Sequence, residues 1–323
     1  MIDGCGRSID YVRISVTDRC NLRCVYCMPD GGVKSLSHAD ILTFEEIERC
    51  VRALARLGVR HVRVTGGEPM VRANCLELIA RINAIEGIET IAMTTNGLLL
   101  KDRVRAARAA GLDSLNVSLD TLDAQRYAQI TRGGRVQDVI SVIDDAQALG
   151  MRVKVNAVPV RGLNDGDLVD LARLAKDRPI HVRFIELMPV GCGASLSPIP
   201  SQEVLGMMRE AFGALDEDDV KHGFGPARYV RPAGFSGSIG VISPISHEFC
   251  DQCNRVRLTA DGYFKLCLNH RAGLDVRALL RGGAGEEELA AALSQAIMQK
   301  PKRHGFDGEA EDREVKRMNE IGG

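Results

Sequence analysis

The residues most able to do chemistry are three cysteines near the amino terminus. Cys20, Cys24 and Cys27 form the pattern CxxxCxxC within the stretch C-N-L-R-C-V-Y-C. Three thiolates at this spacing can hold three irons of a [4Fe–4S] cluster and leave the fourth iron open to bind and reduce a small molecule. A structural zinc loop is the alternative, but zinc usually takes paired cysteines and four ligands, and no second thiol pair follows nearby.

A glycine-rich turn follows the next predicted strand. The sequence G-G-E-P at residues 66–69 comes directly after the apolar pattern of residues 61–65. A strand followed by two glycines is common on its own, but together with CxxxCxxC it resembles the radical S-adenosylmethionine (SAM) superfamily. The resemblance implies that this turn holds the SAM amino group and that Tyr26 packs against the adenine.

A second group of cysteines lies in the last quarter of the chain. Cys250, Cys253 and Cys267 form C-x2-C-x13-C, with His247 before them and His270 after them. Three cysteines and a histidine at this spacing also make an acceptable zinc site, so spacing alone leaves both metals open. The first cysteine group favours iron–sulfur here as well.

Composition limits the partners of the chain. Its 323 residues are 45% hydrophobic and 26% charged, which suits one large or two moderate domains. The net charge of −1 favours neither nucleic acid nor a membrane surface, and we find no signal-peptide core. Grouped cysteines predict metal binding in a reducing, cytoplasmic compartment. No role is predicted for the remaining cysteines, Cys5, Cys50, Cys75 and Cys192.

The elements that must position the cysteines alternate between strands and helices. Strand patterns lie near residues 12–16, 61–65, 90–95, 114–119, 152–158 and 181–187. Helix patterns lie at residues 43–57, 73–84, 98–110, 136–149 and 165–176. This alternation predicts an α/β fold with a parallel sheet, either doubly wound or curled into a partial barrel. It stops near residue 195, which predicts a first domain over residues 1–195 and a smaller α+β domain over residues 196–323.

Polar residues on alternate strand positions separate the two architectures. In the first strand Val12 and Ile14 share one face, while Arg13 and Ser15 share the other, and the later strands repeat this pattern. A doubly wound sheet would bury the polar face beneath helices at a cost of about 1–3 kcal/mol per unpaired group. We therefore predict a (βα)6 partial TIM-type barrel with a polar cavity.

The predicted cavity carries several cations. Arg13, Arg63, Lys154 and Arg183 fall on the polar face, and Arg255 and Arg257 flank Val256 after the second cysteine group. Guanidinium groups match phosphate oxygens two at a time, so this set predicts a polyphosphate ligand. A single strand arginine could equally form a surface salt bridge. The chain has no GxxxxGK[ST] loop, which argues against a P-loop nucleotidase.

Motifs along nearly the whole chain resemble one enzyme family. T-D-R-C-N-L-R-C-V-Y-C-M, V-T-G-G-E-P, T-T-N-G, N-V-S-L-D, V-K-V-N, R-F-I-E-L-M and C-x2-C-N-R-V-R-L-T occur in this order. They are similar to the GTP 3′,8-cyclases, the radical SAM lyases that begin molybdenum cofactor (molybdopterin) biosynthesis. The chain departs from the family at His61, where a lysine is often found beside the substrate phosphates.

The resemblance implies a mechanism. Cluster 1 on Cys20, Cys24 and Cys27 reduces SAM, methionine leaves, and the 5′-deoxyadenosyl radical takes the 3′ hydrogen of GTP. The ribose radical attacks C8 of guanine, and a reductive step gives (8S)-3′,8-cyclo-7,8-dihydroguanosine 5′-triphosphate. Cluster 2 on Cys250, Cys253 and Cys267 presents its open iron to the guanine.

The resemblance also assigns further residues and partners. The residues implied for SAM binding are Tyr26, Gly67, Ser118 and Met188. The residues implied for GTP binding are Arg13, Arg63, Thr94, Lys154, Arg183, Arg255, Val256 and Arg257. The resemblance implies a reductant protein of the flavodoxin or ferredoxin type. It is also compatible with a homodimer.

The carboxyl-terminal tail gives two opposing expectations. Residues 307–321 are mostly charged, which by composition predicts a frayed terminus. The tail ends in Gly322-Gly323, which is thin enough to enter a narrow crevice. The resemblance implies that it enters the active site and is needed for turnover.

Two rival functions share some of these features. A radical SAM enzyme with an auxiliary cluster that acts on a peptide would share the first motif without needing a cationic cavity. A non-enzymatic zinc or iron–sulfur binding module would explain the cysteines alone, and it would predict an exposed basic surface.

Overall fold

The computed structural model describes residues 1–306 and 314–322. Its centre is a 12-stranded sheet in the order β12-β11-β10-β1-β2-β3-β4-β5-β6-β9-β8-β7. Neighbours among the first six strands pair in parallel. These strands are β1 (Tyr11–Ser15), β2 (His61–Thr65), β3 (Thr90–Thr95), β4 (Ser114–Ser118), β5 (Arg152–Ala157) and β6 (His181–Ile185).

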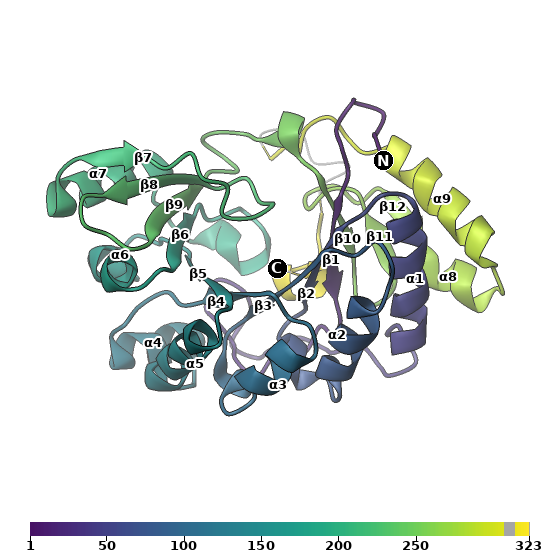
Figure 1. The fold of residues 1–323 in the computed structure, drawn as a ribbon, viewed down its shortest axis with the longest axis horizontal. Helices are drawn as coiled ribbons and strands as arrows, with labels where there is room; N and C mark the ends of the chain where they lie inside the picture. The colour runs from purple at the N-terminus through teal and green to yellow at the C-terminus, as the bar shows by residue number, and fades with distance from the viewer. Residues whose placement is uncertain (307–313, 323) are drawn as a thin grey trace.

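Helices connect these parallel strands. They are α1 (Phe44–Arg56), α2 (Cys75–Asn83), α3 (Val104–Ala109), α4 (Ala124–Thr131), α5 (Val136–Ala148), α6 (Leu168–Asp177) and α7 (Ser201–Phe212). Figure 1 shows α1 to α6 as an outer arc around the strands, with the described end of the chain on the inner side. The (βα)6 partial barrel predicted from the sequence is therefore confirmed.

The two faces of each strand meet different surroundings. Val12, Ile14, Val62 and Val64 are fully or almost fully buried in the hydrophobic core against the helices. Each such side chain contributes about 1.5–3 kcal/mol when it is fully buried. Because side chains alternate across a strand, the intervening polar residues must point into the barrel.

Local signals explain where the helices begin and end. Thr43 Oγ1 accepts a hydrogen bond from the Glu46 backbone (3.1 Å), and Glu46 Oε2 accepts one from the Thr43 backbone (2.7 Å), which completes the capping box of α1. The helix predicted over residues 98–110 is wrong in its first half. A 3-10 turn at Leu98–Leu100 is followed by Asp102 with a φ of 62°, a left-handed conformation that cannot continue a helix.

The carboxyl-terminal segment extends both edges of the sheet. Strand β9 pairs in parallel with β6, and β10 pairs in parallel with β1. The added strands are β7 (Leu215–Glu217), β8 (Arg228–Pro232), β9 (Ser238–Ile242), β10 (Arg255–Leu258), β11 (Tyr263–Lys265) and β12 (Gly273–Asp275). The last helices are α8 (Val276–Arg281), α9 (Glu286–Met298) and α10 (Met318–Ile321). Because both segments share the sheet, the division at residue 195 stays a prediction.

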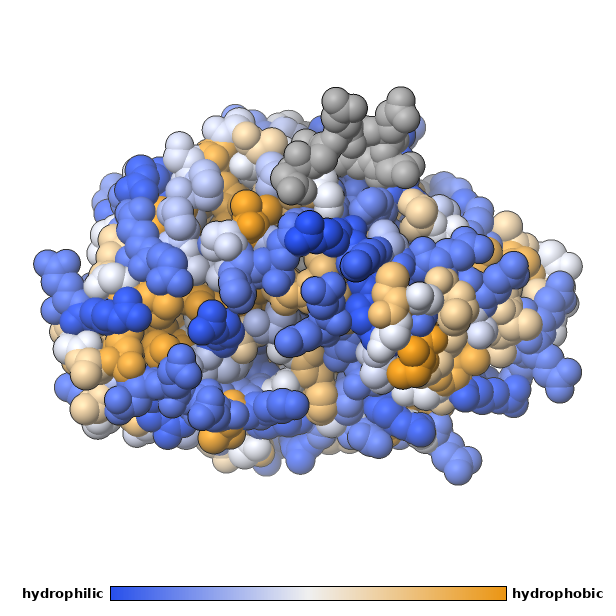
Figure 2. Space-filling view, turned by 90° about the horizontal axis from the view of Figure 1, so that it is seen from above, coloured by the Kyte–Doolittle hydropathy of each residue, from blue (hydrophilic) through white to orange (hydrophobic). Residues whose placement is uncertain are grey.

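The molecular surface is mixed in character. Hydrophilic residues dominate the face shown in Figure 2, with hydrophobic groups scattered among them. Within the described ranges, the helices are all too short or too polar to cross a membrane.

Candidate active site

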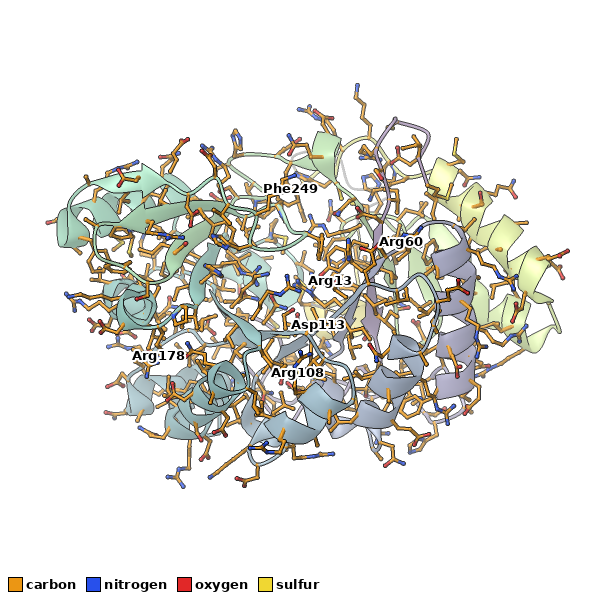
Figure 3. The ribbon with its side chains drawn as sticks, viewed as in Figure 1. Arg13, Arg60, Arg108, Asp113, Arg178 and Phe249 are labelled. Carbon is orange, nitrogen blue, oxygen red and sulfur yellow. The ribbon has the colours of Figure 1, made fainter. Side chains whose placement is uncertain are left out.

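A central cavity lies inside the barrel, and both cysteine groups line it. Figure 3 shows Arg13 and Phe249 on the inner side of the strands. The other predicted site residues in its wall are Tyr26, Arg63, Gly67, Thr94, Ser118, Arg183, Met188, Arg255 and Arg257. The structure therefore brings together residues from almost the full length of the chain.

Two of the residues predicted to bind GTP lie outside the wall of this cavity. Val256 is fully buried in the hydrophobic core, so its side chain faces away from the cavity and leaves only its backbone available to a ligand. Lys154 is 5% exposed, pairs in register with His181 at the start of β6, and has its Nζ close to Gly223.

The first cysteine group is a set of free thiols in the loop after β1. Burial raises the pKa of the Cys20 thiol to about 11, and burial together with the neighbouring thiols raises the pKa of Cys27 to about 12. Thiolates in this setting need a bound cation to be stable. The Asn96 side chain and the Leu22 backbone both donate to Cys20 Sγ, at 3.8 and 3.4 Å. This donor set fits three ligands of an iron–sulfur cluster.

The glycine-rich turn beside this group is held by a buried carboxylate. Thr95 Oγ1 donates to Glu68 Oε1 (2.8 Å), and the Asn96 backbone donates to Glu68 Oε2 (2.7 Å). Burial raises the pKa of Glu68 to about 7. A Cβ at Gly67 would lie 2.7 Å from the carbonyl oxygen of Asp18, so a larger residue would displace the turn. These contacts tie the turn to the end of β3.

Tyr26 is positioned by a residue that the sequence analysis missed. Its phenol donates to Asp120 Oδ2 (2.6 Å), and the Val158 backbone donates to Asp120 Oδ1 (2.8 Å). Burial raises the pKa of this carboxyl to about 6. The available signal was the last residue of N-V-S-L-D, which follows β4 at the carboxyl-terminal edge of the sheet.

Two of the arginines in the barrel, Arg183 and Arg63, have no acidic partner among the described residues. Arg183 donates only to neutral amides, at Asn156 Oδ1 (2.8 Å) and Asn116 Oδ1 (2.6 Å), among the contacts of the described residues. Arg63 is half-buried, its buried Nε donates no hydrogen bond to a described residue, and desolvation lowers the pKa of its guanidinium. Thr94 Oγ1 is also buried without a hydrogen bond. Unpaired buried donors beside several positive charges favour an anionic ligand.

The second cysteine group lies beside β10. Burial opposes ionisation of Cys253, but Arg255 and Lys300 outweigh it and lower the pKa of this thiol to about 7. The backbone N–H of His304 donates to Cys250. His270, a possible zinc ligand by spacing, instead has its Nε2 3.0 Å from the carbonyl oxygen of Arg303. The set of three thiols therefore fits the predicted iron–sulfur cluster better than the alternative Cys3His zinc site.

Arg7 links the second cysteine group to the amino terminus by hydrogen bonds, a role that the sequence alone did not indicate. Its Nε donates to Asp3 Oδ2 (2.7 Å). Its Nη groups donate to the carbonyls of Cys250 (3.0 Å) and of residues 300–302 (2.9–3.2 Å). All five donors of the guanidinium are used, so Arg7 fixes two distant segments against each other.

The tail enters the central cavity. Arg257 Nη1 donates to the carbonyl oxygen of Gly322 (2.7 Å), and the backbone N–H of Asn319 donates to Cys27. Asn319 Nδ2 also donates to the carbonyl of Asp18 (3.1 Å). The frayed terminus predicted from composition is therefore wrong for residues 314–322, because these polar contacts hold them inside the barrel. Gly323 and residues 307–313 lie outside the described residues.

These features define the class of the protein. The family model for the radical SAM superfamily matches residues 14–175, and the family model for Molybdenum Cofactor Synthesis C matches residues 180–306. The chain belongs to the radical SAM superfamily.

Relatives that match the chain over its full length identify its family within this superfamily. The chain is 48% identical over 327 residues to a GTP 3′,8-cyclase of Pelotomaculum thermopropionicum and 45% identical over 327 residues to one of Heliobacterium modesticaldum. Both matches cover 100% of each chain. The chain is a member of the GTP 3′,8-cyclase family.

Solved structures agree on the fold. The crystal structure of Streptococcus suis SuiB bound to S-adenosylmethionine aligns with a TM-score of 0.65 and 15% identity. The alignment covers 93% of this chain and 74% of SuiB. At this identity the likeness extends to the fold alone.

Proposed function

We infer that this chain is a lyase that converts GTP to (8S)-3′,8-cyclo-7,8-dihydroguanosine 5′-triphosphate, the first step of molybdenum cofactor biosynthesis. One observation carries this conclusion: two separate groups of free cysteines face one cavity, and its wall includes Arg63 and Arg183, which have no acidic partner among the described residues. Anaerobic incubation with GTP, SAM and dithionite tests it. We expect 5′-deoxyadenosine with GTP and only background amounts with guanosine.

Different residues of this chain would hold the clusters, bind the phosphates and position SAM. Cys20, Cys24 and Cys27 would hold one [4Fe–4S] cluster, and Cys250, Cys253 and Cys267 the other. When bound, the first cluster and SAM supply the one-electron chemistry that starts hydrogen abstraction from the ribose. The arginines fix the phosphates and so orient the ribose, while the glycine-rich turn and the Tyr26–Asp120 pair would position SAM. The inserted tail narrows the cavity and excludes water.

We expect Arg255→Ala and Arg257→Ala each to weaken GTP binding by about 1–3 kcal/mol, the range for charge-assisted hydrogen bonds. Both guanidinium groups line the cavity. SAM binding should be nearly unchanged. Isothermal titration with GTP and with guanosine measures the effect, and guanosine binding as tightly as GTP would show that the arginines do not bind phosphate.

GTP binding should be coupled to proton uptake by Lys154. Burial, followed by repulsion from Arg183 and Arg63, lowers the pKa of this amine to about 6 in the ligand-free chain. A bound triphosphate favours the charged amine and raises its pKa, so binding at pH 8 should take up about one proton. GTP affinity should therefore rise as the pH falls from 8 towards 6.

Titrations at pH 8 in two buffers of different ionisation enthalpy count the protons taken up. The Lys154→Met variant is the control, because it keeps most of the apolar stem of the side chain and removes the amine. Equal proton uptake by the variant and the natural chain would contradict the assignment to Lys154.

A flavodoxin or ferredoxin and a cytoplasmic location complete the proposal. All ten cysteines are free, as expected in a reducing compartment. Replacing dithionite by reduced flavodoxin or ferredoxin tests the electron donor. The homodimer stays a prediction.

A further inference from the structure

One aromatic residue in the wall of the central cavity was not predicted from the sequence. Tyr11 is the first residue of β1, and it lines the central cavity together with Arg13. Because side chains alternate across a strand, these two residues share the face that points into the barrel. Tyr11 is 3% exposed, and its hydroxyl makes no hydrogen bond with another described residue. The hydroxyl is therefore available to a ligand in the cavity.

Strand pairing places Tyr11 directly beside one arginine. Arg255 of β10 lies in register with it on one side, and His61 of β2 lies in register on the other. Arg255 lines the central cavity and His61 does not. The His61 ring instead stacks on Phe224, at 3.3 Å between ring centroids. At this level of the barrel, the described residues of β10, β1 and β2 that line the cavity are therefore Arg255 and Tyr11.

The next level of the barrel adds further guanidinium groups. Arg13 pairs in register with Arg63 of β2 and with Arg257 of β10, and all three line the cavity. The Arg63 guanidinium lies over the Tyr11 ring, 5.4 Å from its centroid, a distance typical of a cation–π contact. Desolvation lowers the pKa of these three guanidinium groups, and the Tyr11 phenol partly opposes this effect on each of them. Tyr11 is thus close enough to interact with all three.

A second tyrosine shows that an unpaired hydroxyl alone does not mark a binding site. Tyr127 is 1% exposed, and its hydroxyl also makes no hydrogen bond with another described residue. Tyr127 belongs to the hydrophobic core and does not line the central cavity. Tyr11 differs because it lines a cavity beside several arginines. An O–H donor in that place can add a hydrogen bond to an anion that the arginines attract.

We propose that the Tyr11 hydroxyl donates a hydrogen bond to a phosphate group of the bound nucleotide. The proposal rests on the function inferred above and adds a substrate-binding residue to it. Guanidinium groups lie beside Tyr11 at both levels of the barrel, so the partner of the hydroxyl is a phosphate and not the uncharged guanine. Tyr11 is a neutral donor, so it adds this hydrogen bond without adding to the repulsion among the arginines.

This hydrogen bond fixes the position of the phosphate. Charges attract an anion from many directions, whereas a hydrogen bond between two oxygens needs a distance of about 2.5–3.0 Å and a nearly linear geometry. The Tyr11 ring is already buried in β1 and contacts Arg63, so the side chain loses little freedom when a nucleotide binds. A fixed phosphate also orients the ribose that is attached to it.

Isothermal titration of the anaerobically reconstituted Tyr11→Phe variant with GTP and with guanosine tests the proposal. The variant keeps the ring over which Arg63 lies and removes only the hydroxyl. We expect GTP to bind at least about tenfold more weakly, because a hydrogen bond to a charged group is lost. Guanosine affinity, SAM binding, iron content and the unfolding temperature should be unchanged. Tyr127→Phe is the matched control, because it removes an equally buried hydroxyl outside the cavity.

Three results would overturn the role of Tyr11. The first is an unchanged GTP affinity in Tyr11→Phe. The second is an equal loss of GTP and guanosine affinity, which would place the hydroxyl against the nucleoside and not against a phosphate. The third is the same loss of GTP affinity in Tyr127→Phe, which would show a general effect of removing a buried hydroxyl. GTP binding no tighter than guanosine binding by the natural chain would instead overturn the proposed function, which separates the two failures.

Discussion

Removing Gly322 and Gly323 will stop formation of the cyclic nucleotide while folding, cluster content and SAM binding stay intact. The deletion breaks the 2.7 Å hydrogen bond from Arg257 to the Gly322 carbonyl but keeps the Asn319 contact with Cys27. It also removes the chain that fills the space beside Ser15 and Thr65. Misplaced reacting groups cost on the order of 100-fold in rate, so we expect at least that loss of product.

Product and 5′-deoxyadenosine should be quantified together, because a misplaced substrate still permits SAM cleavage. Gly322→Ala should share the defect, since its Cβ would lie 2.9 Å from the Cβ of Ser15 at a φ of 74°. Val315→Ala is the control within the tail, because Val315 is 71% exposed. A truncated enzyme that forms product at the full-length rate would show that the glycines are incidental.

Replacing Cys267 with serine will lower the iron content from about eight to about four atoms per chain, because each three-cysteine cluster holds four irons. The first group uses different residues, so SAM cleavage should continue without forming the cyclic product. Without the second cluster, the guanine has no iron to bind. SAM cleavage is then no longer coupled to formation of the cyclic nucleotide.

Iron and sulfide analysis with electron paramagnetic resonance measures this change. Cys5→Ser is the matched control, since Cys5 is a free, exposed thiol outside both groups. One tightly held zinc per natural chain after anaerobic reconstitution would contradict the second cluster.

The barrel and its cation-lined interior could be predicted because their signals are local. Alternation of residues such as Val12 and Arg13 depends only on the geometry of a strand, and the cysteine spacing only on neighbouring residues. The strand bounds at residues 61–65 and 90–95 agree with the structure for the same reason.

The features that were missed depend on contacts between distant segments. Nothing near Arg7 in the sequence indicates that it meets the carbonyls of residues 300–302, and nothing near Phe224 indicates a stack on His61. The pairing of β9 and β10 with opposite edges of one sheet is also invisible to periodicity. Such contacts follow from the packed fold, where tertiary structure and not local preference decides the neighbours.

The central claim is that this chain abstracts the 3′ hydrogen of GTP. The most direct test is a single anaerobic turnover with SAM, dithionite and GTP that carries deuterium at C3′, followed by mass spectrometry of both products. We predict that deuterium moves into 5′-deoxyadenosine in step with formation of the cyclic nucleotide. Unlabelled 5′-deoxyadenosine formed alongside cyclic product that still carries the deuterium would contradict it.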